Sequence, residues 1–103
     1  MPKAKWTSKA RDDLRSIGRY IGQHDKRPST AEKIIQEIAA KCDEYSEAFF
    51  RGSVLGSDAS FLADGCRIFA HKRWVIVFEP NGNGIEVLRI FDGSRDFPTL
   101  FGG

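Results

Sequence analysis

Basic side chains gather around one histidine, His71, in the C-terminal third of the sequence. Cations can stabilise the charge that develops on a phosphorane, and a histidine can move a proton near neutral pH. The group therefore has the composition of a small ribonuclease site. Its members, all expected on strands or in turns, are Arg67, His71, Lys72, Arg73, Arg89 and Arg95.

Each of these residues also has a structural interpretation. Arg89 could pair with Glu86 or Glu79 across neighbouring strands, and two of the other cations fall in an expected turn. His71 has no second histidine beside it to share proton transfer. Both interpretations stay open, and the catalytic one would assign the chemistry to Arg67, His71 and Arg95.

Other reaction types lack the residues that they need. No Ser or Cys stands in a nucleophile motif with a histidine, and Gly82 and Gly84 precede no helix with a phosphate-binding lysine, so they indicate a hairpin turn. Cys42 and Cys66 form no CxxC pair, and with two histidines they cannot build a convincing four-ligand zinc site. We expect no metal, no cofactor and two reduced, buried thiols.

A second candidate surface is a row of three arginines, Arg11, Arg15 and Arg19, which recur every four residues and so share one helix face. Such a row is either solvated, with Arg–Asp pairing, or contacts an anionic partner. Residues 1–27 contain eight Lys/Arg and three Asp, net +5, whereas residues 28–103 contain eight Lys/Arg and eleven Asp/Glu, net −3. This asymmetry suggests an acidic partner, and both a nucleic acid and an acidic protein segment fit it.

Apolar side chains also occur in a tail interrupted by Gly and Pro. Phe97, Leu100 and Phe101 either fold back onto the core or offer an apolar surface to a partner. Phe49 and Phe50, expected at the end of the second helix, pose the same alternative.

The elements that position these residues follow from apolar spacing. A first helix is expected after Thr7 or Ser8 as N-cap, and a second helix after the capping box formed by Ser29 and Glu32. The apolar face of the first comprises Ala10, Leu14, Ile17 and Ile21; that of the second comprises Ala31, Ile34, Ile35, Ile38, Cys42 and Tyr45.

Three strands are expected over residues 66–70, 74–79 and 85–91, after an irregular segment over 51–65 and a short extended piece near 3–7. The Asn-Gly steps within residues 80–84 favour a tight hairpin. Both faces of the central strand are apolar, so both are expected to be covered. The order predicts an α+β domain, β-α-α-β-β-β, with a helical hairpin packed on a small antiparallel sheet.

Size and composition indicate the number of domains and the class of protein. With 103 residues, of which 41% are hydrophobic, the chain is expected to form one domain over residues 1–103. The longest apolar run, Val75 to Phe78, is too short to span a bilayer, and no apolar leader follows the basic start. We expect a cytoplasmic protein without membrane contact.

Four segments together carry a family resemblance. They are Ala10-x-x-Asp13-Leu14-x-x-Ile17-x-x-Tyr20-Ile21, Gly65-x-Arg67-x-Phe69, the strand Trp74 to Phe78, and Val87-Leu88-Arg89-Ile90-Phe91-Asp92-Gly93-Ser94-Arg95-Asp96. In this order and spacing, from about Trp6 to Phe101, the sequence resembles the RelE/ParE superfamily of bacterial toxins. The resemblance implies the same helical hairpin on a small sheet.

The two branches of that superfamily differ in activity. RelE-like members cleave mRNA on the ribosome with sheet cations and a C-terminal tyrosine, whereas ParE-like members inhibit DNA gyrase. Val75 stands where the nucleases tend to carry an arginine and Phe101 where they carry the tyrosine, and neither can replace the lost chemistry. The resemblance therefore favours the ParE branch, with the RelE-like nuclease as the alternative.

The resemblance also implies partners. A ParE-like toxin of a type II toxin–antitoxin module would bind DNA gyrase and would be neutralised, in a hetero-oligomer, by a cognate ParD-like antitoxin whose acidic segment wraps it. Cations steer an acidic chain and apolar pockets anchor it. The expected antitoxin-binding residues are Arg11, Arg15, Arg19, Leu100 and Phe101.

Overall fold

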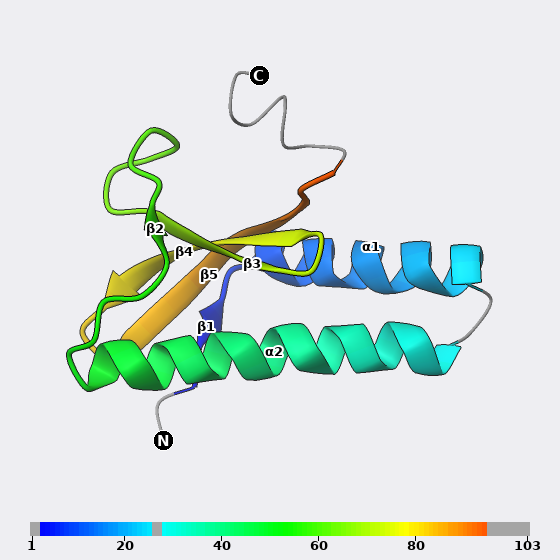
Figure 1. The fold of residues 1–103 in the computed structure, drawn as a ribbon, viewed down its shortest axis with the longest axis horizontal. Coiled ribbons are helices and arrows are strands. Elements are labelled where there is room, and N and C mark those ends of the chain that lie inside the picture. Colours follow the sequence, from blue (N-terminus) through cyan, green and yellow to red (C-terminus); the bar gives the residue numbers. More distant parts are fainter. Residues whose placement is uncertain (1–2, 26–27, 95–103) are drawn as a thin grey trace.

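Two antiparallel helices packed on a five-stranded sheet make up the described part of the protein (Figure 1). The structure is a computed structural model that describes residues 3–25 and 28–94. The expected α+β class and helical hairpin are confirmed. In chain order the elements are β1 (Lys5–Trp6), α1 (Ser8–Asp25), α2 (Pro28–Phe50), β2 (Ser57–Asp58), β3 (Arg67–His71), β4 (Trp74–Asn81) and β5 (Gly84–Asp92).

The start of α1 is fixed by Thr7, as the sequence predicted. Its hydroxyl oxygen accepts a hydrogen bond from the backbone N–H of Ala10 at 3.1 Å, which satisfies one free donor of the first turn. The start of α2 differs from the prediction, because the helix begins at Pro28 and Ser29 already lies inside it. Proline suits a first helical position, where its missing N–H costs nothing.

The sheet is mixed, with strand order β1-β5-β4-β3-β2. The expectation of a purely antiparallel sheet is wrong at one edge, where β1 pairs in parallel with β5. The long connection that parallel pairing requires contains both helices and the strands β2, β3 and β4. The segment expected to be irregular contains β2, a two-residue strand that pairs antiparallel with β3.

A bulge at Leu88 interrupts the pairing of β4 with β5. Val77 pairs with Arg89 and Phe78 pairs with Val87, so Leu88 has no partner residue on β4. Thr7 holds this bulge: its hydroxyl donates to the carbonyl oxygen of Leu88 at 2.9 Å, and its N–H donates to that of Val87 at 3.0 Å. The extra residue lets Val87 and Ile90, three positions apart, both enter the core beneath the helices.

Apolar side chains cover both faces of the sheet. The apolar residues on both faces of the central strand had predicted this. The face toward the helices carries Trp74, Ile76 and Phe78 of β4 within the main core. The other face carries Val77 in a smaller cluster with Ala59 and Cys66, which the segment between α2 and β3 contributes. Cys42 and Cys66 are buried free thiols, and burial raises the pKa of the Cys42 thiol to about 12.

The β4–β5 hairpin docks on α2 through a contact that excludes any side chain at Gly84. The φ angle of Gly84 is +137°, and a Cβ built there would lie 2.0 Å from Oγ of Ser46. That buried hydroxyl accepts a hydrogen bond from the N–H of Ile85 at 3.1 Å. The close approach therefore joins the turn to the second helix.

We expect Gly84→Ala to lower the free energy of unfolding by more than about 3 kcal/mol, because strain at this φ angle adds to overpacking. Urea denaturation followed by circular dichroism measures the change. Gly82→Ala is the matched control, since a Cβ there meets nothing within 4 Å. Equal stability of the two variants would contradict this account of the hairpin.

Candidate functional site

Arg67 holds a loop in place. Its Nε donates to the carbonyl oxygen of Leu55 at 2.8 Å, and its Nη2 donates to that of Gly56 at 2.7 Å. These bonds fasten the segment after α2 to β3. The guanidinium that the nuclease interpretation required is thus engaged with backbone carbonyls.

Arg89 pairs with a residue of α1, so the predicted pairing with Glu86 or Glu79 is wrong. Its Nε and Nη2 donate to the two carboxylate oxygens of Asp13 at 2.8 and 3.1 Å, a bidentate ion pair that raises the pKa of Arg89. Asp13 also accepts the backbone N–H of Ile90 at 2.9 Å. The carboxylate reaches this donor because β1 is only two residues long and ends before Ile90.

His71 and Lys72 both contact Glu37 on α2. Nε2 of His71 lies 2.9 Å and Nζ of Lys72 lies 3.2 Å from the same carboxylate oxygen. The hydrogen bonds from His71 and then from Lys72 hold the pKa of the Glu37 carboxyl below its usual range. His71 therefore joins the sheet to the helix.

Arg73, the next residue of the same turn, joins β4 to the end of β5. It forms a bidentate ion pair with the buried Asp92, which raises the pKa of the arginine. Its guanidinium also lies over the rings of Tyr20, at 5.4 Å, and Trp74, at 5.0 Å. The N–H of Gly93 donates to the Arg73 carbonyl oxygen at 2.6 Å, so this arginine fixes the end of β5.

The proposed catalytic set is not brought together among the described residues. Arg67 is directed to the loop before β2, and His71, at the other end of β3, is directed to α2. Arg95 lies outside the described residues. Within residues 3–25 and 28–94, no group of three His, Cys, Asp or Glu side chains could hold a metal ion.

The α1 cations are differently placed. The guanidinium of Arg11 makes no hydrogen bond or ion pair with any described residue, whereas Arg15 lies 3.1 Å from Asp12 in a pair whose side chains are 73% and 70% exposed. Such an exposed pair contributes little and is easily exchanged. Arg19 has only a 3.4 Å contact with the Ser16 hydroxyl. This row is available to a partner.

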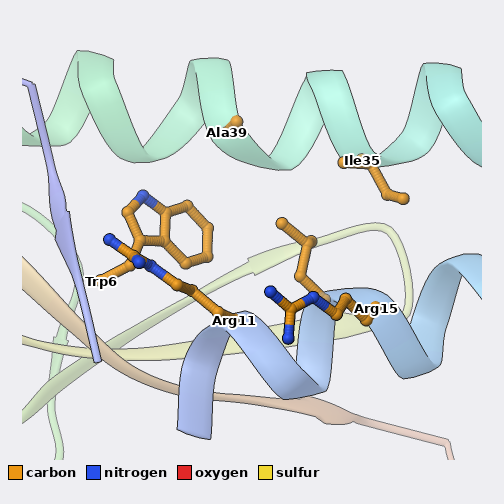
Figure 2. A pocket seen from close by; sticks show the side chains of 6 residues that line it. Trp6, Arg11, Arg15, Ile35 and Ala39 are labelled. Atoms are coloured by element: carbon orange, nitrogen blue, oxygen red, sulfur yellow. The ribbon is translucent and has the colours of Figure 1, made fainter. Parts of the chain in front are cut away.

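A pocket of about 370 Å³ opens between α1 and α2 beside two of these arginines (Figure 2). Figure 2 shows Trp6, Arg11 and Arg15 on one side, with Ile35 and Ala39 of α2 opposite. The sequence predicted the arginines as binding residues, but it did not predict the apolar lining of the pocket. Ile35 belongs to the predicted apolar face of the second helix. Ala39, one turn later, extends that face sideways and is the sequence signal for the pocket.

Two further predicted residues, Leu100 and Phe101, lie outside the described part of the chain. Neither of the two described helices is long and apolar enough to cross a membrane. The arrangement therefore consists of internally paired cations on the sheet, and accessible cations around an apolar pocket on the helices.

Comparison with known protein families identifies the family of this chain. The family described as ParE toxin of type II toxin-antitoxin system, parDE, matches residues 4–97. This chain belongs to the ParE toxin family.

Individual relatives agree with the ParE assignment. Toxin ParE3 of Caulobacter vibrioides is 31% identical over 71 residues, which cover 66% of this chain and 71% of that protein. A chain of the chromosomal ParDE TA system from P. aeruginosa has the same fold, with a TM-score of 0.74 at 24% identity, over 89% of this chain and 96% of that one. The ParE branch of the superfamily, predicted from the sequence, is confirmed.

The Glu37 contacts give this ParE chain a pH-dependent stability. Because the folded-state pKa of Glu37 is depressed, its contribution is present above the unfolded pKa near 4.5 and is lost as the pH falls through the lower folded value. We expect Glu37→Gln to reduce the loss of stability between pH 6 and pH 3, measured by thermal unfolding. Glu44→Gln, which removes an exposed carboxylate paired only with Lys41, is the control. Identical acid profiles for wild type and Glu37→Gln would refute the coupling.

Proposed function

We propose that this ParE-type toxin inhibits DNA gyrase by binding it, without chemistry of its own, and that a cognate antitoxin neutralises it by direct contact. The single observation that carries the absence of chemistry in this proposal is the pairing of the sheet cations. The four described arginines and lysines of the expected nuclease group are each bonded to a carboxylate or to backbone carbonyls. Cations committed in this way are poorly placed to stabilise a phosphorane.

The α1–α2 pocket supports the antitoxin part of the proposal. It combines an apolar lining with the exposed Arg11 and Arg15, and Arg19 continues the row by one turn. An acidic segment that carries a large apolar side chain is complementary to both parts, since cations accelerate its approach and the pocket buries its anchor. Leu100 and Phe101 remain predicted contacts of the same partner.

The partner should be a ParD-like antitoxin, and the complex a toxin–antitoxin hetero-oligomer in the cytoplasm. The structural relative belongs to a chromosomal ParDE TA system from P. aeruginosa, which supports this choice of partner. Gyrase inhibition is proposed from membership of the ParE family. Binding would trap or block the enzyme in its DNA-bound state.

Replacing Arg11, Arg15 and Arg19 together with glutamate should weaken antitoxin binding by about tenfold or more at low salt, because steering becomes repulsion. The association rate of the variant should also no longer fall as salt is added, because the attraction that salt screens has been removed. Surface plasmon resonance with the cognate antitoxin at several ionic strengths measures both effects.

The matched control reverses Lys33, Lys41 and Arg51, which changes the net charge equally on and just after α2. The apolar half of the site is tested by Ala39→Phe, which fills the pocket, against Ala40→Phe on the exposed neighbouring position. Unchanged affinity in the α1 triple variant and in Ala39→Phe would remove this surface from the antitoxin interface.

Gyrase inhibition is tested with purified toxin and a supercoiling reaction. We expect loss of supercoiling, accumulation of cleaved DNA, and recovery of activity when antitoxin is added. Topoisomerase I relaxation of the same plasmid is the control for general inhibition by a basic protein. Full supercoiling at saturating toxin would overturn the proposed target and leave the family membership untouched.

A further inference from the structure

The face of the sheet that is turned away from the helices carries an apolar row near the β3–β4 turn. Ala70 of β3 pairs with Val75 of β4, and Val75 pairs with Phe91 of β5, so the three side chains share one face. Trp74 and Ile76, on either side of Val75 along the strand, belong to the core beneath the helices. These three residues, which we call the outer row, therefore lie outside the main core.

The outer row is next to the smaller core cluster but is not part of it. Within the described residues, the segment before β3 packs Ala59 and Leu62 against Val77, two positions along β4 from the row. Val75 belongs to neither cluster of buried residues, although it is only 6% exposed. Ala70 is exposed and Phe91 is half-buried. A cover from another part of the chain would account for the burial of Val75.

The backbone turns toward the outer row directly after β5. The carboxylate of Asp92 accepts the N–H of Ser94 at 2.9 Å, a bond that closes a turn over residues 92–94. A Cβ built at Gly93 would lie 3.1 Å from Cγ2 of Val75, so the backbone of this turn passes against the valine side chain. The residues that follow Ser94 therefore start beside the outer row.

The nine residues that follow, 95–103, lie outside the described part of the chain and have a suitable composition and length. They include the large apolar side chains of Phe97, Leu100 and Phe101. Nine residues can reach about 30 Å, whereas two strand spacings, from β5 across β4 to β3, measure only about 10 Å. Because the segment is tethered at Ser94, weak apolar contacts are enough to hold it on the sheet.

We infer that residues 95–103 fold back in the free toxin and cover the outer row with their apolar side chains. A second molecule on the same face would lose translational and rotational freedom that a tethered segment has already lost, so the chain's own segment is the favoured cover. The inference concerns the toxin before an antitoxin contacts Leu100 and Phe101. It does not depend on gyrase as the target.

Nuclear Overhauser effects in the full chain test this contact directly, with ¹³C-labelled methyl groups and protonated phenylalanine rings. We expect cross-peaks from the ring of Phe97 or Phe101 to the methyl groups of Val75 and Ala70. Ile35, which lines the α1–α2 pocket beneath the other face, should give none with these rings. A mixture of labelled and unlabelled chains, recorded with isotope filtering, separates contacts within one molecule from contacts between two.

Ala70→Glu places a charge in the outer row at an exposed position, so it should release the segment without disturbing the core. We expect the ring cross-peaks to disappear and the backbone order parameters of residues 97–101 to fall from about 0.8 to below about 0.6. Ala40→Glu, at an exposed position of α2, is the matched control and should change neither. The spectra of residues 3–94 report whether each variant is folded.

Four results would overturn the inference. Order parameters below about 0.6 over residues 97–101 in the wild type would show that the segment is not held, and cross-peaks to Ile35 would place it at the α1–α2 pocket. Cross-peaks seen only between molecules would make a second copy the cover. Cross-peaks unchanged in Ala70→Glu would place the contact away from the outer row. None of these results alters the supercoiling test, so failure here is distinguishable from failure of the proposed function.

Discussion

The attachment of α1 to the last strand depends on one carboxylate, that of Asp13. It accepts hydrogen bonds from the guanidinium of Arg89 and from the backbone N–H of Ile90, so it occupies the edge of β5 where β1 has ended. Residues 11 and 15 lie about half a turn from residue 13 around an α-helix. Fixing Asp13 against the sheet therefore turns Arg11 and Arg15 away from it and toward the pocket between the helices.

The cations of the sheet and those of α1 are used differently. On the sheet, cations join elements: Arg67 fastens a loop, Lys72 joins the turn to α2, Arg73 holds the end of β5, and Arg89 holds α1. On α1, cations are exposed and weakly paired. A fold that commits its central cations to structure and leaves peripheral ones free is suited to recognition of acidic partners, which supports a toxin that acts by binding.

The sequence was sufficient to predict those elements that depend on local residue patterns. Apolar spacing located both helices, and the Asn-Gly steps located the hairpin, where Asn81 accepts the N–H of Asn83 at 2.8 Å. The bulge at Leu88 was not predictable, because Thr7, far away in the sequence, holds it. The Arg89–Asp13 pair was missed for the same reason: acidic residues on adjacent strands were equally reasonable partners until the helix was placed. The arginines of the candidate site followed from their spacing, whereas the apolar pocket beside them required the packing of two helices.

The central claim is that this ParE chain acts by binding and not by cleaving RNA. The most direct measurement is primer extension on an mRNA translated by purified ribosomes, with the toxin at a concentration that stops gyrase supercoiling. The account predicts a full-length extension product and no toxin-dependent stops. Stops in phase with the codons would contradict it, because Arg67 and His71 would then have to leave their present partners and act on the phosphate.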